Sequence, residues 1–250
     1  MPLRPTPLTQ GIALVRLMVQ SGHSLGVTTL AERLGMPKSS VFRLLRSLVE
    51  LGFVQKIEET KRYTVSADIF DFVHEIASHF GKNLKLDGHL RRAASRLKCS
   101  VYLSMLGSRD TYVICGAGDE ANTTRLGSHG PTHASSAGKI LVAQLPEREW
   151  RRFAPDPGER PATPYTNRDP EKFVAQIAQA RATGVAWNIR ESDREIVSLA
   201  AAVREPFLPR ARLAVALVLR YDELRYRDQT ELENAVLKLA ASLERELGGR

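Results

Sequence analysis

The 250-residue sequence has few cysteines, no long apolar run and no repeated or low-complexity tract. The two cysteines, Cys99 and Cys115, are too few for a disulfide scaffold in a chain of this size, which favours a reducing cytoplasm. No apolar run approaches the roughly 18 to 20 residues of a membrane-spanning helix, and the N-terminus lacks the pattern of a secretory signal. We therefore expect a cytoplasmic protein without a membrane partner.

Acidic residues are scarce in the first quarter of the chain. Residues 1–65 contain nine Lys or Arg against four Asp or Glu, whereas residues 66–250 contain 27 against 24. Most of the net charge of +8 thus belongs to a small module, which suggests a polyanion as its partner. Hydrophobic residues make up 43% of the sequence, enough for the cores of two ordinary domains.

The small module has the pattern of a helix-turn-helix. A helix over residues 9–20 is followed by a short helix over 28–34, for which Thr28 is the expected N-cap. Gly35 supplies a turn, and a third helix is predicted from Pro37 to Glu50, because proline suits the first position of a helix. Two short helices joined by a tight glycine turn form this motif.

The third helix has an apolar side for packing and a polar side that suits the major groove of DNA. Serine hydroxyls near its N-terminus suit phosphate oxygens, and arginines one and two turns further on suit base edges. Phe42 could contact a thymine methyl group or complete the core. Two strand-like runs, 53–57 and 61–65, predict a β-hairpin wing with basic residues for further phosphates. The predicted DNA-binding residues are Lys38, Ser39, Ser40, Phe42, Arg43, Arg46, Lys56, Lys61 and Arg62.

A further helix is predicted over residues 66–80, with acidic residues early and an apolar stripe along one side. Such a stripe on a connecting helix indicates a packing face, either between domains or between copies of the chain. Lys82 and Asn83 mark the expected boundary of the larger module.

The larger module is predicted to be α+β, an antiparallel sheet with helices mostly on one face, because its strands and helices interleave without Rossmann-type glycines. We expect strands over 101–106, 111–117, 185–190, 196–203 and 213–220, and helices over 84–98, 148–153, 170–183 and 229–247.

The segment 131–145, which continues a glycine-rich loop that begins at Gly127, allows several readings. A phosphate-binding P-loop is excluded, because His133 and Ile140 stand where a glycine and a hydroxyl residue are needed. Ser136 and Lys139 match S-x-x-K, so the alternative function is an enzyme of small-acid metabolism, although the partner motifs of serine catalysis are absent. His129 and His133 are four apart, but the Gly-Pro pair between them prevents a helical metal site.

What remains at this segment is a helix N-terminus. Its free N–H groups, with the hydroxyls of Ser135 and Ser136, suit a small anion. Plain N-capping by either serine explains the same residues. We predict no catalytic residue, no metal site and no cofactor.

Three segments resemble the IclR family of bacterial transcriptional regulators. AERLGMPKSSVFRLLRSLVELGFV is similar to the family's DNA-binding signature, THASSAGKILVAQL to the start of its ligand-pocket helix, and ESDREIVSLAAAV to a later strand. The resemblance implies a winged helix-turn-helix over 1–65, a linker helix used in dimerisation over 66–82, and a GAF-like effector-binding domain over 83–250. It also implies a homodimer or homotetramer, double-stranded operator DNA and a small organic acid as effector.

By the same resemblance, the effector-binding residues are Ser135, Ser136, Ala137, Asn188 and Ser198. Asn188 is uncharged where some members carry an acid, which favours an anionic ligand. The strand 213–219 is wholly apolar where members that bind glyoxylate-like acids show serines, so we expect a larger, more apolar acid, such as an aromatic carboxylate. Ala202 departs from the family pattern, in which a proline is common near this position.

Overall fold

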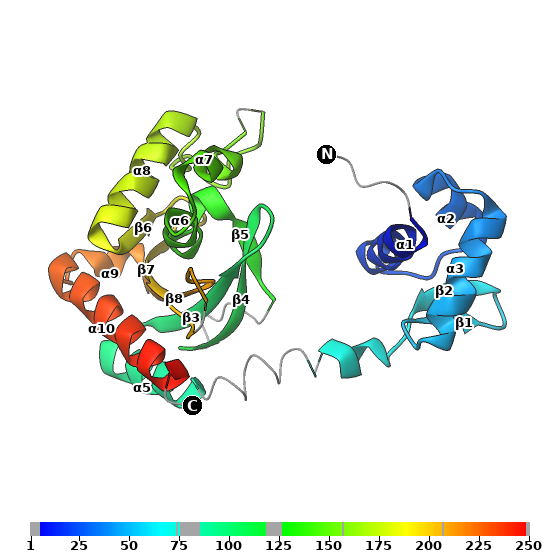
Figure 1. Ribbon diagram of the computed structural model, residues 1–250, viewed down its shortest axis with the longest axis horizontal. Helices are drawn as coiled ribbons and strands as arrows, with labels where there is room; N and C mark the ends of the chain where they lie inside the picture. Colours follow the sequence, from blue (N-terminus) through cyan, green and yellow to red (C-terminus); the bar gives the residue numbers. More distant parts are fainter. Residues whose placement is uncertain are drawn as a thin grey trace. The chain divides into compact units, whose positions relative to one another are not determined.

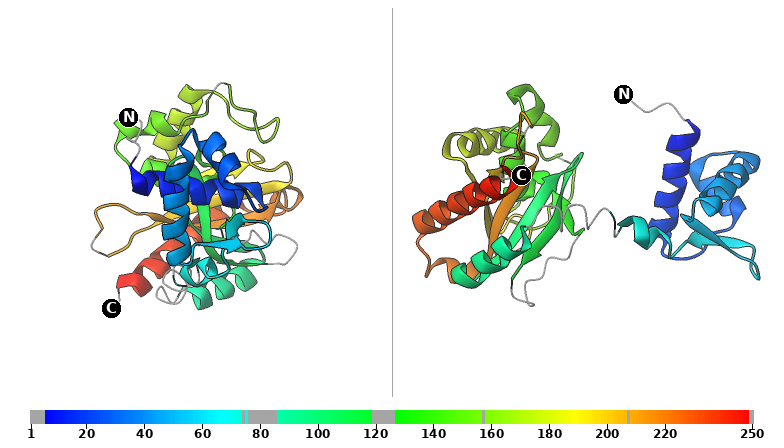
Figure 2. Two further views of the ribbon diagram at one scale, coloured as in Figure 1. Left: turned by 90° about the vertical axis from the view of Figure 1, so that its right-hand side faces the viewer. Right: turned by 60° about the horizontal axis from the view of Figure 1, so that its bottom comes forward.

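A computed structural model of the chain describes residues 6–73, 75, 86–118, 127–156, 158–206 and 208–248. The chain divides into two compact units, Met1–Ile76 and Ala77–Arg250, which are described separately (Figures 1 and 2). The fold class is α+β, as predicted, with a helix-turn-helix in the first unit and an antiparallel sheet in the second. Among the described residues, no helix has both the length and the apolar character that crossing a membrane requires.

The first unit consists of three helices and a two-stranded wing. Its elements are α1 (Pro7–Ser21), α2 (Val27–Leu34), α3 (Lys38–Glu50), β1 (Val54–Ile57) and β2 (Arg62–Val65). In α1, the side chains of Thr6 and Thr9 form a reciprocal capping box around a proline at the start of the helix. Apolar residues of all three helices and the wing form one core, which includes Leu14, Leu30, Val41, Leu45 and Tyr63.

The predicted helix starts in this unit differ from the structure by one or two residues, and α1 begins at Pro7 where residue 9 was expected. The N-cap of α2 is Gly26, whose backbone is extended, and not Thr28, which lies inside the helix. Pro37 is the N-cap of α3 and not its first residue. The turn between the helices is at Gly35, as predicted, where a φ of 62° places the backbone in the left-handed region that glycine tolerates.

The wing is attached to the helices through β2. The strands β1 and β2 pair in antiparallel register, and Leu25 in the turn after α1 exchanges two backbone hydrogen bonds with Tyr63, at 2.8 and 2.9 Å. The hairpin is therefore the outer part of a small sheet that begins beside α2. After the wing, residues 69–73 and 75 are helical, and the predicted boundary at Lys82 and Asn83 lies outside the described residues.

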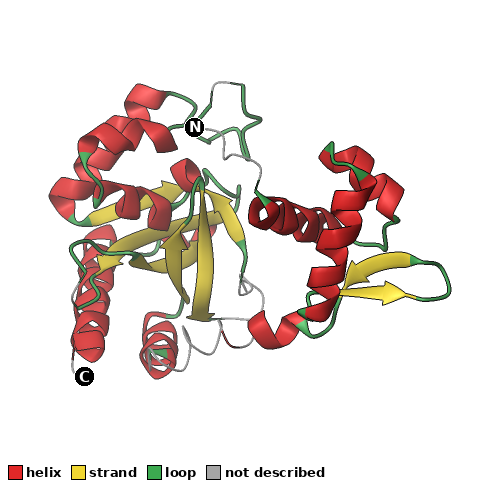
Figure 3. Ribbon diagram, turned by 45° about the vertical axis from the view of Figure 1, so that its right-hand side comes forward, coloured by secondary structure: helices red, strands yellow, loops and turns green. Residues whose placement is uncertain are grey.

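The second unit is built on a six-stranded antiparallel sheet of order β5-β4-β3-β8-β7-β6 (Figure 3). The strands are β3 (Ser100–Leu106), β4 (Asp110–Ala117), β5 (His129–Pro131), β6 (Val185–Ile189), β7 (Ile196–Val203) and β8 (Leu213–Arg220). The helices are α5 (Asp87–Leu97), α6 (Ser136–Ala143), α7 (Glu147–Trp150), α8 (Pro170–Thr183), α9 (Tyr221–Leu224) and α10 (Gln229–Gly248), with short 3-10 turns at Thr132–Ala134 and Arg151–Phe153.

Helices cover both faces of this sheet, so the prediction of helices mostly on one face is wrong. Large residues of the central strands, such as Leu199 and Val215, share a core with α5 and α10. The small residues that alternate with them, such as Ala200 and Ala214, share a second core with α6 and α8. Figure 1 shows α6 and α8 on one side of the sheet and α5 and α10 on the other. Because side chains alternate between the faces of a strand, an unbroken apolar strand indicates burial on both faces.

The helix α6 lies inside the unit, and all eight of its residues are buried. It runs over the small residues of β7 and β8, which permit a close approach of helix and sheet. This packing brings the first turn of α6 beside β6 and β7, where the predicted effector-binding residues lie.

Candidate DNA-binding and effector-binding sites

The outer face of α3 carries the predicted DNA contacts. Lys38, Ser39, Arg43 and Arg46 are exposed on it, and Ser40 is half-buried near the helix N-terminus. The opposite side of the helix is buried through Val41 and Leu45. Phe42 is 57% exposed, so it does not complete the core and stays a candidate for a contact with DNA.

Arg46, one of the exposed arginines on this face, has a partner within its own helix. The Arg46 guanidinium donates to the Glu50 carboxylate at 3.0 Å, one helical turn away. Both side chains are largely exposed, and surface pairs of this kind contribute little to stability. Arg46 can therefore exchange this partner for a phosphate or a base at small cost.

In the wing, one carboxylate holds two lysines. The ammonium groups of Lys56 and Lys61 both donate to Glu58 at 2.9 Å. These hydrogen bonds, led by that of Lys61, lower the pKa of Glu58 to about 2. The carboxylate therefore stays ionised at neutral pH and neutralises part of the positive charge of the wing.

Arg62 has a different environment from the other basic residues of the wing. Its guanidinium donates from Nε to the carbonyl and the hydroxyl oxygen of Ser24, both at 3.1 Å. The side chain thus ties the wing to the turn before α2.

The first turn of α6 brings together four of the five predicted effector-binding residues. Ser135 is the N-cap, and its hydroxyl accepts from Gly138 N at 3.2 Å. Ser136 shares a hydrogen bond of 2.8 Å with the hydroxyl of Ser198 in β7. Ala137 follows Ser136 in the same turn and is buried.

Asn188, the fifth predicted residue, lies opposite Ser198 in the register of β6 and β7. Its amide nitrogen donates to Ser198 Oγ at 3.3 Å and to Ser192 Oγ at 2.8 Å. Its amide oxygen accepts from Glu191 N at 2.9 Å. Hydrogen bonds thus connect Ser136, Ser198 and Asn188 between α6 and the sheet, and Ser135 and Ala137 flank Ser136 in the chain. We call these five residues the α6 cluster.

Gly138 allows the first turn of α6 to pack closely. A Cβ atom at this position would lie 2.4 Å from Thr132 O and 2.7 Å from Thr111 Oγ1, closer than real Cβ atoms come. The glycine at position 138 therefore has a steric reason. The absence of a side chain lets α6 start against β4 and against the 3-10 turn that contains Thr132.

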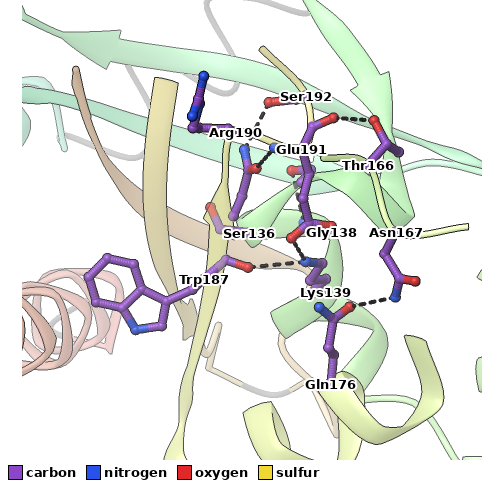
Figure 4. Close-up of polar contacts among 12 residues, drawn as sticks. Ser136, Gly138, Lys139, Thr166, Asn167, Gln176, Trp187, Arg190, Glu191 and Ser192 are labelled. Carbon is purple, nitrogen blue, oxygen red and sulfur yellow. Dashed lines mark hydrogen bonds and ion pairs between the residues drawn. The ribbon is translucent and has the colours of Figure 1, made fainter. Parts of the chain in front are cut away.

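A buried ion pair lies next to the α6 cluster, and it was not predicted from the sequence. Lys139 Nζ donates to Glu191 Oε1 and to Trp187 O, the latter at 3.1 Å (Figure 4). Burial lowers the pKa of the Lys139 ammonium, while the Glu191 carboxylate acts in the opposite direction. Glu191 Oε2 has no hydrogen-bond partner within the part of the chain that the structure describes.

The two histidines of the glycine-rich segment are apart from this pair. His129 stacks on Tyr112, with ring centroids 5.3 Å apart. His133 is buried, and burial lowers its pKa. Within the described ranges, no group of three or more His, Cys, Asp or Glu residues has the arrangement of a metal site.

Two family models match the chain. The model of the IclR helix-turn-helix domain matches residues 7–58, and that of the bacterial transcriptional regulator IclR C-terminal domain matches residues 74–245. The Escherichia coli transcriptional repressor IclR is 29% identical over 215 residues, 80% of this chain and 76% of that protein. The acetate operon repressor of Salmonella typhimurium is 29% identical over 257 residues, 97% of this chain and 90% of that protein.

Solved structures of regulators share the fold. A putative IclR transcriptional regulator from Silicibacter sp. TM1040 has a TM-score of 0.77 at 21% identity, covering 98% of this chain and 97% of that one. An IclR homologue from Microbacterium hydrocarbonoxydans, complexed with 4-hydroxybenzoate, has a TM-score of 0.72 at 17% identity. The match covers 98% of this chain and 100% of that one. With family models matching both units, the chain belongs to the IclR family of bacterial transcriptional regulators.

Proposed function

We propose that this regulator binds double-stranded operator DNA through α3 and the wing, and that a small organic acid bound at the α6 cluster modulates the binding. The observation that carries the proposal is the pairing of an exposed basic helix face with a buried polar cluster in a separate unit. One unit has the chemistry for phosphates and base edges, and the other has the chemistry for a small anion.

In this proposal the residues of α3 divide the work of recognition. Arg43 and Arg46 read base edges, for which guanine O6 and N7 are the usual arginine partners. Lys38, Ser39 and Ser40 hold phosphates beside the positive end of the helix. Phe42 contacts a thymine methyl group, and Lys56 and Lys61 reach phosphates from the wing, which Arg62 anchors.

The effector is proposed to be an aromatic carboxylate. The acid group would be held by the N–H groups and hydroxyls of the first turn of α6, together with Asn188 and Ser198. The apolar character of β8 favours a ligand with more apolar surface than a two-carbon acid. The structural neighbour that is complexed with 4-hydroxybenzoate supports this class.

We also propose that the protein works in the cytoplasm as a homodimer or a dimer of dimers, because the family's linker helix implies dimerisation. Phe70, Phe72 and Val73 are exposed on the helix after the wing, at 71%, 50% and 48%. Exposed apolar side chains on one short segment suit burial against a second copy. Light scattering across a range of concentrations tests this, and a monomer at all concentrations would contradict it.

The alternative function, an enzyme that uses Ser136 and Lys139, is not favoured. The Ser136 hydroxyl is paired with the hydroxyl of Ser198, and Lys139 is paired with the Glu191 carboxylate. A nucleophilic serine needs a base within hydrogen-bond reach, and neither contact supplies one to Ser136.

The test is fluorescence anisotropy with DNA from upstream of the protein's own gene, against scrambled DNA, at several salt concentrations. Each titration is repeated with aromatic and aliphatic acids. We expect tighter binding to the upstream DNA and a change in that affinity with an aromatic acid. Equal binding to both DNAs, lost with salt and indifferent to every acid, would leave only nonspecific electrostatics.

A further inference from the structure

The turn between β6 and β7 is held by a loop that is distant in the sequence. Residues 163–167, here called the strap, belong to the connection that precedes α8. Thr163 and Thr166 are buried against the turn, at 4% and 8% exposure. Asn167 donates to Gln176 Oε1 at 3.1 Å, which ties the end of the strap to α8 (Figure 4).

Each threonine hydroxyl of the strap connects the strap to the turn. Thr163 Oγ1 accepts from Tyr165 N at 3.0 Å and donates to Arg190 O at 2.6 Å. Thr166 Oγ1 accepts from Thr163 N at 2.9 Å and donates to Glu191 O at 2.7 Å. A hydroxyl can serve in this way because it both donates and accepts, which an isosteric valine cannot do.

The residues held by the strap are the ones that continue into the α6 cluster. Glu191 N donates to the Asn188 amide oxygen, and the Glu191 side chain pairs with Lys139 in α6. Orientation of the Asn188 amide in turn decides whether its nitrogen faces Ser198. The path from Thr166 to Ser198 therefore runs through hydrogen bonds of Glu191 and Asn188.

Arg190 holds the same turn from the outside. Its backbone has a φ of 61°, which is unfavourable for a residue with a side chain. The guanidinium lies between the rings of Tyr165 in the strap and Tyr221 in α9, at 4.0 and 4.4 Å from their centroids. Contacts from the strap and from α9 thus keep the turn in a conformation that is unfavourable for the backbone by itself.

We propose that the strap is a positioning element of the effector site: through Thr163 and Thr166 it sets effector affinity without contacting the effector. The inference rests on the proposed function, because it requires an acid to bind at the α6 cluster. Residues that orient a binding group control affinity when their own hydrogen bonds fix its geometry to a fraction of an ångström. Here the oriented groups are the Asn188 amide and the first turn of α6 through Lys139.

The test compares Thr166→Val, Thr166→Ser and Thr183→Val in the full-length protein. Thr183 is the matched control, since its hydroxyl also donates to carbonyl oxygens, those of Gln179 and Val185, but has no contact with the turn. Calorimetry with benzoate, 4-hydroxybenzoate and pyruvate identifies the acid that the unsubstituted protein binds. For that acid we expect Thr166→Val to weaken binding by about tenfold and Thr166→Ser to restore it.

The other readouts separate positioning from a general loss of structure. Operator affinity without acid should be the same in all three variants, and Thr183→Val should bind the acid as the unsubstituted protein does. Unchanged acid affinity in Thr166→Val would overturn the inference and leave the proposed function standing. Weakening of acid binding in Thr166→Ser by as much as in Thr166→Val would do the same. Failure of the unsubstituted protein to bind any of the three acids would overturn both.

Discussion

Lys139 in α6 and Glu191 in the turn after β6 form an ion pair across 52 positions of sequence, with side chains 2% and 9% exposed. Removing two charges from water has a large free-energy cost, which their attraction must offset. The packing of α6 on this turn therefore depends on both side chains. Loss of either one leaves the other as an uncompensated buried charge.

Breaking this pair by one substitution should destabilise the protein strongly. We expect Lys139→Met alone and Glu191→Leu alone to reduce the free energy of unfolding of the second unit by about 3 to 5 kcal/mol. The double variant should recover most of that loss, because no charge is left buried. Urea unfolding followed by near-UV circular dichroism measures the three values, and losses that simply add in the double variant would contradict the expectation.

A second prediction concerns the close approach at the start of α6. Gly138→Ala should destabilise the second unit by about 1 to 3 kcal/mol, since the added methyl group would meet backbone at 2.4 Å. Gly130→Ala in β5 is the matched control, because a Cβ there meets nothing within 4 Å. Thermal unfolding of both variants decides: equal midpoints would mean that the helix start can shift without cost.

How far the sequence predicted this molecule depended on whether the signal was local. The bounds of α8 were predicted as found, because Pro170 suits the first position of the helix and Gly184 ends it. The predicted N-cap of α2 was wrong by two residues, because Gly26 and not Thr28 occupies the cap. A threonine near a helix start is a common cap, and only the backbone conformation distinguishes the two.

The two-sided sheet and the buried ion pair were missed for different reasons. The alternation of large and small apolar residues in β7 and β8 indicates burial on both faces, whereas the prediction of helices mostly on one face used only the order of strands and helices. The pairing of Lys139 with Glu191 had no such signal, because charged residues give no period and these two lie far apart in sequence. The α6 cluster residues were assigned from family resemblance, and the structure brings them together, while their role stays a proposal.

Neutralising Glu58 should strengthen DNA binding through the wing. Glu58→Gln removes the carboxylate that holds Lys56 and Lys61, so both lysines become available to phosphates and a charge that repels DNA is lost. We expect affinity at low salt to rise several-fold, about equally for operator and scrambled DNA. Anisotropy titrations at four salt concentrations measure this.

The matched control for the wing is Glu59→Gln, the neighbouring exposed acid at the tip of the hairpin. If removal of either carboxylate has the same effect, net charge alone explains the gain and the specific pairing of Glu58 with the lysines does not matter. The low pKa of Glu58, about 2, also predicts how its pairing with the lysines depends on pH. Since its folded-state pKa lies below the usual 4.5, the carboxylate stays ionised and paired at neutral pH. The stability that the pairing contributes is lost as pH falls from about 4.5 towards 2, and the pairing itself is lost around pH 2.

The proposed roles of the two units predict that substitutions of Arg43 and Ser136 affect different properties, operator affinity for Arg43 and the response to acid for Ser136. Arg43→Ala should weaken operator binding by about 1 to 3 kcal/mol and relax the preference for operator over scrambled DNA, because a base-edge contact is lost. Ser136→Ala should leave operator affinity without acid intact and change the response to acid, because its hydroxyl belongs to the α6 cluster.

Both variants are measured in one anisotropy experiment, with and without the acid that the unsubstituted protein binds. Lys38→Ala serves as the control for charge alone: loss of a phosphate contact should weaken binding to operator and scrambled DNA alike, and reduce the salt slope by about one. An Arg43→Ala variant that behaves like Lys38→Ala would remove Arg43 from base recognition and leave it as a phosphate contact. Operator binding that falls in Ser136→Ala without any acid would mean that the α6 cluster supports the DNA-binding state itself, and effector response would then be read as a shift of that same equilibrium.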